Sequence, residues 1–264
     1  EDGYDEDEDV MMAGEYIEDI FQYMRDRETN LGRMLYAEDQ PDDRWSRRRA
    51  LMDWLTCAHG SLKLLPETLY LAVNYLDRYL SKNRDMRDEE LGCVGMTALF
   101  IAAKYEEEYV IPLEDLMKLS SDPPEESQVL SQEELMLRSL DYDLGWPCPV
   151  SFLRRNSKAD DYDREVRNLA KYLLEVTIME KRFVRCVSSF RAAGAYCLAR
   201  LLLERGDWTP LHVYYSGYTM IQLDQMVLMI LECCRNPREH HPSIYKKYQK
   251  KKYKKAARLV RRKI

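Results

Sequence analysis

The chain has 264 residues, enough for one large domain or for two domains of roughly 130 residues each. Hydrophobic residues make up 45% of the sequence and charged residues 33%, so the chain can bury a core and is not of the disordered class. No apolar run reaches the roughly 18 residues of a membrane-spanning helix, and we expect no membrane partner. The seven cysteines, an odd number scattered through apolar stretches, favour reduced thiols in an intracellular protein. The start at Glu1, with neither Met nor an apolar leader, predicts a fragment without a secretory signal.

Charge is distributed unevenly along the chain. Residues 1–9 hold seven acidic and no basic side chains, whereas residues 246–264 hold eleven basic and no acidic ones. Without both segments, the overall charge of −6 becomes about −10 for the body of the chain. Nucleic-acid-binding domains usually carry a basic face, so we expect no nucleic-acid partner. Residues 1–12 are predicted to be an acidic, disordered end.

The apolar residues of the first half recur with helical spacing. Ile17, Ile20, Phe21 and Met24 form a narrow stripe within a predicted N-terminal helix over residues 13–30. Further helices are predicted over 45–62, from Pro66 through Leu80, and over 88–106, 112–119 and 123–140. The segment 88–106 has little polar surface and is rich in small residues around Gly95, which is typical of a buried helix against which neighbours pack closely.

The pattern restarts after Pro147 and Pro149. Helices are predicted over 169–179, 189–205, 211–218 and 220–234, and the second of these is again rich in small residues, around Gly194. No segment shows the two-residue alternation of a strand. We interpret the chain as an all-α protein with an internal duplication of a roughly 100-residue unit, joined at about 143–149. One large helical domain is the alternative.

Signatures of catalysis are missing from the sequence. There is no Gly-rich phosphate loop, no GxSxG and no HExxH. Two groupings could be drawn as zinc sites, but neither has CxxC spacing: Cys57 with His59, and Cys233 and Cys234 with His240 and His241. We therefore expect no metal, no cofactor and no enzyme activity.

Four separated strings, in order, resemble one family: RALMDWL (49–55), LLPETLYLAVNYLDRYLS (64–81), VGMTALFIAAKYEE (94–107) and FLRRNSKADDYD (152–163). They resemble cyclins, specifically mitotic B-type cyclins of fungal character, from about Tyr16 to the end of the chain. The resemblance implies an all-α fold of two tandem five-helix cyclin boxes preceded by an N-terminal helix. The boxes would span 31–144 and 145–264. The second box would end in a basic helix that packs on that box. Alternatively, the basic end is a nuclear-import patch.

The resemblance also implies a function. A cyclin is a non-catalytic regulatory subunit that binds and activates a cyclin-dependent protein kinase. The resemblance to mitotic cyclins implies action at the G2/M transition and a location in nucleus and cytoplasm. It also implies that the chain binds substrates and regulators of the kinase. Lys104 and Glu133 match the pair that hydrogen-bonds kinase backbone, and an ammonium with a carboxylate can engage both ends of a peptide unit. Apolar and aromatic positions that contact the kinase are matched by Ile20, Tyr23, Ile101, Tyr105, Leu137, Tyr142 and Leu144. Without the resemblance, the charged pair would be interpreted as solvated surface and the apolar positions as core.

The family's docking patch for Arg-x-Leu peptides is only partly kept. Leu51, Trp54 and Leu91 match it, but Arg47 and Ala50 stand where Met and Ile are expected, Cys57 replaces an acid, and Gly92 replaces glutamine. Arg47 adds positive charge where an arginine should bind, and Cys57 removes the opposite charge. We therefore expect weak or altered recognition of Arg-x-Leu peptides.

Two further charged groups match the family. Arg155, Arg167 and Lys171 match a basic cluster that receives phosphorylated peptides, and the last two, four residues apart, share a helix face; ordinary surface bases are the alternative. Arg48 and Asp77 match a buried structural ion pair.

Two rival classes of function remain. One is a cyclin-fold transcription factor that binds promoter DNA, which should show a basic face. The other is a helical hydrolase, for which the sequence offers no nucleophile–base pair.

Overall fold

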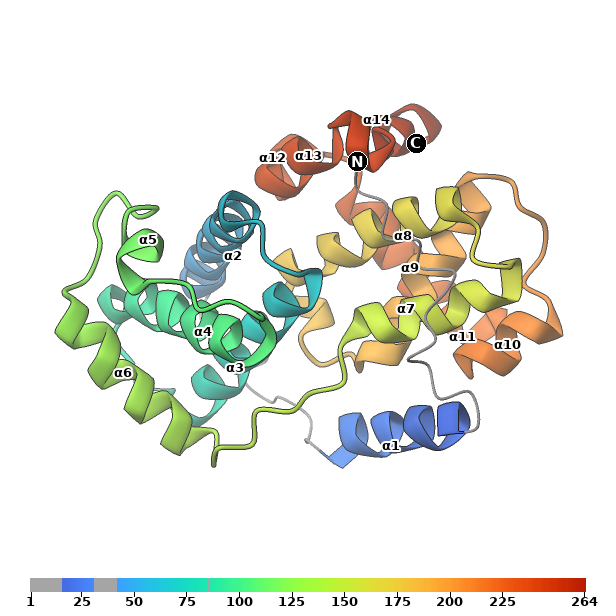
Figure 1. The fold of residues 1–264 in the computed structure, drawn as a ribbon. Helices are drawn as coiled ribbons and strands as arrows, with labels where there is room; N and C mark the ends of the chain where they lie inside the picture. Colours follow the sequence, from blue (N-terminus) through green and yellow to red (C-terminus); the bar gives the residue numbers. More distant parts are fainter. Residues whose placement is uncertain (1–15, 31–41, 85) are drawn as a thin grey trace.

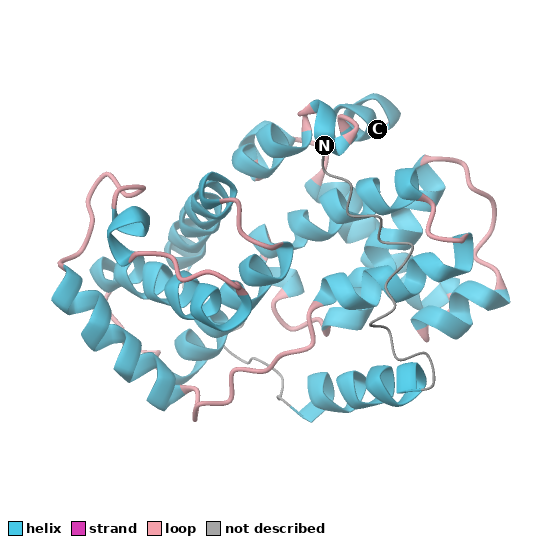
Figure 2. Cartoon of the chain, in the orientation of Figure 1, coloured by secondary structure: helices cyan, strands magenta, loops and turns pink. Residues whose placement is uncertain are grey.

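The structure is a computed structural model that describes residues 16–30, 42–84 and 86–264. The described residues form helices joined by loops, with no strand among them, and they divide into two helical bundles that lie side by side (Figures 1 and 2). The predicted disordered end over 1–12 lies outside the described residues. No helix in the described ranges is both long and apolar enough to cross a membrane.

The first bundle contains five α-helices, one of which is central. They are α2 (Asp42–Leu62), α3 (Pro66–Lys82), α4 (Leu91–Glu106), α5 (Leu113–Met117) and α6 (Glu126–Ser139), with a 3-10 turn at Asp88–Glu90. The central helix is α4, in which every residue from Val94 to Ala103 is buried. Because it is apolar on nearly all sides, it can be covered by α2, α3 and α6 at once.

The second bundle repeats this arrangement around α9. Its helices are α7 (Pro149–Ser157), α8 (Arg164–Val176), α9 (Ser188–Leu202), α10 (Pro210–Ser216) and α11 (Met220–Cys233), with 3-10 turns at Lys158–Asp160, Thr177–Met179 and Lys181–Phe183. α9 is buried from Ser188 to Arg200 except at Phe190 and is covered by α7, α8 and α11. The sequence analysis did not predict α7, which begins at Pro149, where a proline in the first turn needs no backbone donor.

One glycine in each central helix permits close packing. A Cβ built on Gly95 would lie 2.5 Å from Leu51 Cδ1 of α2, and one on Gly194 would overlap Met226 of α11. The duplication inferred from the sequence is therefore visible in the packing, because each bundle brings a neighbouring helix against its central helix at a glycine.

The N-terminal helix α1 (Ile17–Asn30) packs beneath the second bundle rather than the first (Figure 1). Phe21 stacks on Phe152 of α7 with ring centroids 5.9 Å apart. At the far end, the buried Glu28 carboxylate accepts hydrogen bonds from the backbone N–H (3.0 Å) and the hydroxyl of Ser189, at the start of α9. The carboxylate thus satisfies a donor that the first turn of α9 leaves open.

The two bundles are also joined directly. Ser243, in α13 (Pro242–Tyr248), donates from its N–H (2.9 Å) and its hydroxyl (2.6 Å) to Asp53 of α2. The connecting segment, residues 140–148, joins α6 to α7. Its carbonyls at Leu144 and Asp143 accept hydrogen bonds from Tyr75 (2.9 Å) and Arg78 (2.8 Å) of α3. Side chains from the first bundle therefore hold both the connection and the C-terminal helices.

The basic C-terminal segment is not one continuous helix. It consists of α12 (Pro237–His240), α13, a 3-10 turn at Lys251–Tyr253 and α14 (Ala256–Lys263). Lys254 and Lys255 have φ angles of 49° and 56°, and such left-handed backbone ends a helix. α14 does pack on α8, as expected for a C-terminal helix on the second bundle, and it buries Val260.

Candidate functional site

Lys104 and Glu133 face each other across α4 and α6. The Lys104 Nζ lies 2.8 Å and 3.0 Å from the two carboxylate oxygens of Glu133, and 4.1 Å from the ring centroid of Phe100. The Lys104 side chain is 41% exposed and that of Glu133 is 15% exposed. The two groups predicted from separate strings therefore form one ion pair at the surface, which leaves donor and acceptor capacity for a partner.

Aromatic side chains stand out beside this pair. Tyr105 is 51% exposed and Tyr142 is 65% exposed, while Leu137 and Leu144 are half-buried. Tyr142 has a left-handed backbone (φ 55°), which is rare for a bulky residue. Its N–H donates to the carbonyl of Leu137 at 3.0 Å, and this closes the end of α6.

Ile101 does not reach this surface. It is 2% exposed and belongs to the core of the first bundle. Lys104 and Tyr105, three and four residues further along, share its face of α4, but they stand at the exposed end of the helix, whereas Ile101 lies in the stretch that the bundle covers. Its expected contact role is therefore corrected to supporting the surface from within.

The predicted residues of α1 add a second part of the surface. Ile20 is 47% and Tyr23 is 64% exposed, because Phe21 takes the buried face of the helix. A groove of about 410 Å³ is lined by Tyr23 of α1, Tyr105 of α4 and Trp146 of the connecting segment, among others. Candidate contact residues that lie about 80 positions apart in the sequence therefore border one groove.

A larger groove lies where the docking patch was predicted. It has a volume of about 830 Å³, and Leu51, Trp54 and Gly92 are among its lining residues. The Trp54 indole donates to the Leu119 carbonyl at 3.0 Å, while Leu51 and Leu91 are buried. The lining also contains four carboxylate side chains that the sequence analysis did not consider: Glu89, Glu90, Asp122 and Glu125.

Three of the four altered positions of the patch lie outside the groove, and the fourth, Gly92, lines it. Arg47, Ala50 and Cys57 are exposed on α2 and are not among the residues that line the groove. The Cys57 thiol lies 2.9 Å from the Ser243 hydroxyl, so it faces the C-terminal helices. The replacement of an acid by Cys57 therefore changes the surface toward the C-terminal helices rather than the lining of the groove.

The predicted basic cluster is divided by the structure. Arg155 pairs with Glu18 of α1 at 2.6 Å and lies over the Phe21 ring, 4.4 Å from its centroid. Lys171 has its pKa lowered, first by burial and then by the charges of Arg167 and Arg154. Arg155 is directed to α1, whereas its neighbour Arg154 points elsewhere, because adjacent residues of a helix point about 100° apart. The pairing of Arg155 with α1 could not be read from the sequence.

Arg48 and Asp77 form the buried ion pair between α2 and α3. Arg48 Nε and Nη2 donate to the two carboxylate oxygens at 2.9 Å and 2.8 Å, and Nη1 donates to the Ile178 carbonyl at 2.9 Å. Both side chains are almost fully buried. The last contact crosses to the second bundle, so the pair also fixes the bundles against each other.

The described residues form two all-helical bundles of five helices, preceded by one further helix, and this architecture defines a duplicated all-helical protein. Residues 19–145 match the family "Cyclin, N-terminal domain" and residues 147–262 match "Cyclin, C-terminal domain". The chain belongs to the cyclin family. Its all-α fold of two tandem cyclin boxes is as predicted.

Within the family, the chain is similar to fungal mitotic cyclins. It is 44% identical to the G2/mitotic-specific cyclin-4 of Candida albicans over 96% of this chain and 52% of the relative. It is also 44% identical to G2/mitotic-specific cyclin-4 of Saccharomyces cerevisiae over 97% of this chain and 56% of the relative. It is 39% identical to the G2/mitotic-specific cyclin-B of Emericella nidulans, over 96% of this chain and 53% of the relative. The chain thus spans about half the length of these relatives.

Solved structures show the same fold. A viral cyclin from herpesvirus saimiri superposes with a TM-score of 0.68 at 17% identity, covering 92% of this chain and 96% of that one. A chain of the yeast RNA Pol II CTD kinase CTDK-1 complex gives a TM-score of 0.60 at 16% identity, covering 76% and 74%. At these identities the likeness concerns the fold alone.

Proposed function

We propose that this protein is the regulatory subunit of a mitotic cyclin-dependent protein kinase, which it binds and activates at the G2/M transition. The observation that carries the proposal is the surface pair Lys104–Glu133, 2.8 Å apart and bordered by the exposed Tyr105 and Tyr142. Ile20 and Tyr23 extend the same surface along α1. With the buried Ile101 set aside, the candidate positions that support the proposal come from four segments: α1, α4, α6 and the residues after α6.

The proposed mechanism needs no chemistry from this chain. Aromatic side chains supply buried contact area, and the paired charges offer donors and acceptors to a kinase backbone segment. Contact free energy gained on the active arrangement of the kinase shifts its population toward that state. In a protein kinase, this means an inward regulatory helix, a complete Lys–Glu ion pair and an ordered activation loop. The role is therefore that of a regulatory, non-catalytic subunit.

The direct test mixes the 264-residue chain with a mitotic cyclin-dependent kinase and measures complex formation and histone phosphorylation. We expect a complex with strongly increased kinase activity. A Lys104→Ala/Glu133→Ala variant should weaken the complex by about 2–5 kcal/mol, because the kinase groups that it leaves unpaired are desolvated. Its unfolding free energy should change by less than about 1 kcal/mol, since the pair is surface-exposed.

The matched control is Lys118→Ala, which breaks another surface ion pair of the first box, the one with Asp115 at 2.8 Å. It should leave both complex formation and kinase stimulation unchanged. If the unmodified chain neither binds nor stimulates the kinase, the proposed function is wrong. If Lys118→Ala weakens the complex as much as the double variant does, the proposed surface is wrong.

We further propose that the chain helps to recruit substrates and regulators of the kinase. The 830 Å³ groove beside Trp54 is of a size to hold a short peptide, and Arg167 and Lys171, one turn apart on α8, offer positive charge to a phosphate. Reversing the charge at Arg167 and Lys171 should abolish phosphopeptide binding while sparing kinase activation. Equal phosphopeptide affinity in that variant would contradict the idea.

DNA binding by a cyclin-fold transcription factor is not favoured, because the match to mitotic cyclins extends over both boxes and the body of the chain is acidic.

We propose a nuclear and cytoplasmic location, in keeping with a role in mitosis and with the exposed bases of α14, among them Arg261, Arg262 and Lys263. Imaging of the tagged chain with and without residues 246–264 tests it. Exclusion from the nucleus at every stage of the cell cycle would contradict this location.

A further inference from the structure

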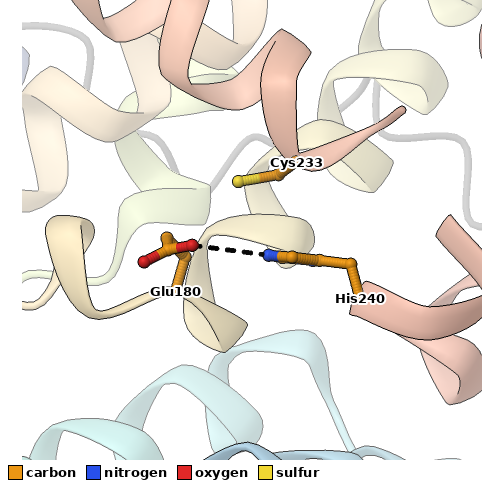
Figure 3. Close-up of side chains that lie close together, drawn as sticks. All are labelled: Glu180, Cys233 and His240. Carbon is orange, nitrogen blue, oxygen red and sulfur yellow. Dashed lines mark ion pairs between the residues drawn. The ribbon is translucent and has the colours of Figure 1, made fainter. Parts of the chain in front are cut away.

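Three potential metal-ligating side chains meet near the end of α11. They are Glu180, between two 3-10 turns, Cys233, the last residue of α11, and His240, the last residue of α12. One ligand atom from each, a carboxylate oxygen, the thiol sulfur and an imidazole nitrogen, lies within 4.8 Å of the others. Figure 3 shows the three side chains converging from separate segments of the chain. Bringing these groups together required the folded chain, because Glu180 is more than 50 residues from Cys233.

One of these ligand atoms is buried without a hydrogen-bond partner. The His240 Nε2 has no hydrogen bond to any described residue. Glu180 Oε2 lies 3.7 Å away, an ion-pair distance when the imidazole is protonated and longer than a hydrogen bond, as the dashed line in Figure 3 shows. A buried polar atom without a hydrogen bond is costly in free energy and is unusual in a folded protein. This atom points at the other two ligands.

The other ring nitrogen of His240 is positioned by further groups. His240 Nδ1 lies 3.0 Å from His241 Nδ1, and His241 Nε2 lies 2.7 Å from the Tyr172 hydroxyl. When His240 Nδ1–H donates to His241, the Nε2 lone pair is directed at Glu180 and Cys233. Metal-binding histidines are oriented in this way, by a hydrogen bond from the nitrogen that does not bind the metal.

The charges around the group are compatible with a divalent cation. Arg182 Nη2 lies 3.5 Å from Glu180 and 3.9 Å from the Cys233 sulfur, but Nη1 is held at 2.7 Å by Glu232 outside the group. A thiolate and a carboxylate together carry two negative charges, which one divalent cation neutralises. Arg182 then keeps Glu232 as its partner and can donate to the thiolate from the side.

We propose that Glu180, Cys233 and His240 form a binding site for a divalent metal ion of the zinc class. The donor set of one sulfur, one nitrogen and one oxygen is that of Zn²⁺ in proteins, and three ligands leave a tetrahedral position for water. Cys233 binds as the thiolate, so its proton is released to solvent and metal affinity rises with pH. The sequence expectation of no metal site rested on missing CxxC spacing; Cys233 and His240 were grouped in the sequence, but the third ligand, Glu180, comes from a segment more than 50 residues earlier.

The metal would stabilise the part of the fold that joins the two boxes. It would link the 3-10 turn after α8, the end of α11 and α12, which leads directly into α13. Ser243 of α13 in turn binds Asp53 of the first box. Metal binding is therefore expected to raise the stability of the packing between the boxes.

The test adds Zn²⁺ to the chelator-treated 264-residue chain and measures binding by calorimetry and the melting temperature. A 1:1 complex and a melting temperature raised by several degrees are expected. Co²⁺ in place of Zn²⁺ should give the absorption of a sulfur-bound, tetrahedral ion. Cys233→Ser and His240→Ala should lower Zn²⁺ affinity at least about 100-fold, and the milder Glu180→Gln about 10-fold.

Cys57→Ser is the matched control, because Cys57 is the exposed cysteine and lies outside the group. It should bind Zn²⁺ with unchanged affinity, whereas loss of binding in this variant would place the metal elsewhere. Far-UV circular dichroism checks that Glu180→Gln and Cys233→Ser are folded. Undiminished Zn²⁺ affinity in both, or cobalt spectra without a sulfur band in the unmodified chain, would overturn the proposal.

Discussion

Arg48 of α2 and Asp77 of α3 form a two-pronged ion pair, with N–O distances of 2.9 Å and 2.8 Å, in the interior between the boxes. The third interaction of the guanidinium is with the Ile178 carbonyl of the second box, at 2.9 Å. The pair therefore fixes two helices of one box and the position of the other box. The kinase-binding surface that we propose draws on both sides of this junction, since α1 packs on the second box.

Removing one member of this pair should be strongly destabilising. Arg48→Met leaves the Asp77 carboxylate buried without its partner, and we expect a loss of about 3–5 kcal/mol in the unfolding free energy. Urea unfolding followed by circular dichroism measures it. The double variant Arg48→Met/Asp77→Leu should recover part of the loss, because no buried charge remains unpaired. A loss below about 1 kcal/mol in Arg48→Met would contradict the structural role.

The two packing glycines predict matched effects in the two boxes. Gly95→Ala and Gly194→Ala would push Leu51 and Met226 from their places, and each should cost about 1–3 kcal/mol through overpacking. Gly60→Ala in α2 is the control, because a Cβ there meets nothing within 4 Å. It should stabilise the chain by about 0.5–1 kcal/mol, since alanine is the better helix former. Equal effects at all three sites in thermal unfolding would show that packing is not the cause.

Glu28 predicts a dependence of stability on pH. Burial raises the pKa of its carboxyl above the usual 4.5, and the two hydrogen bonds from Ser189 only partly oppose this. The folded state therefore keeps this proton to higher pH than the unfolded state does. The protonated Glu28 carboxyl therefore contributes to the unfolding free energy fully below pH 4.5, and this contribution is lost as pH rises through the raised pKa of the folded state.

Glu28→Gln should remove this part of the pH dependence. Its unfolding free energy, relative to that of the unmodified chain, should rise as pH increases from 4.5 toward neutrality. Glu126→Gln, at an exposed position of α6, is the control. Parallel stability curves for Glu28→Gln and the unmodified chain over this interval would disprove the assignment to Glu28.

The docking groove predicts weak recognition of Arg-x-Leu peptides. The apolar floor at Leu51 and Trp54 remains, but Arg47 and Ala50, exposed on α2, stand where Met and Ile are expected, so that a charge is added and apolar area is lost. Calorimetry with an Arg-x-Leu peptide should therefore show weak binding. Arg47→Met/Ala50→Ile should tighten it roughly tenfold, equivalent to about 1.4 kcal/mol, and Trp54→Ala should abolish it. Tight binding by the unmodified chain would show that the carboxylates of the groove compensate.

The sequence by itself determined the helical class, the duplication and the family, because these depend on apolar periodicity, on the glycines at 95 and 194, and on strings of contiguous residues. It also indicated Lys104 with Glu133 and Arg48 with Asp77. Only the tertiary structure decided the direction in which each side chain points. Ile101 is covered by the core, Arg155 turns to Glu18 of α1, and Glu180 meets Cys233 and His240. Periodicity fixes which residues share a helix face, but the packing of other helices decides whether that face is covered, and distant segments leave no common local pattern.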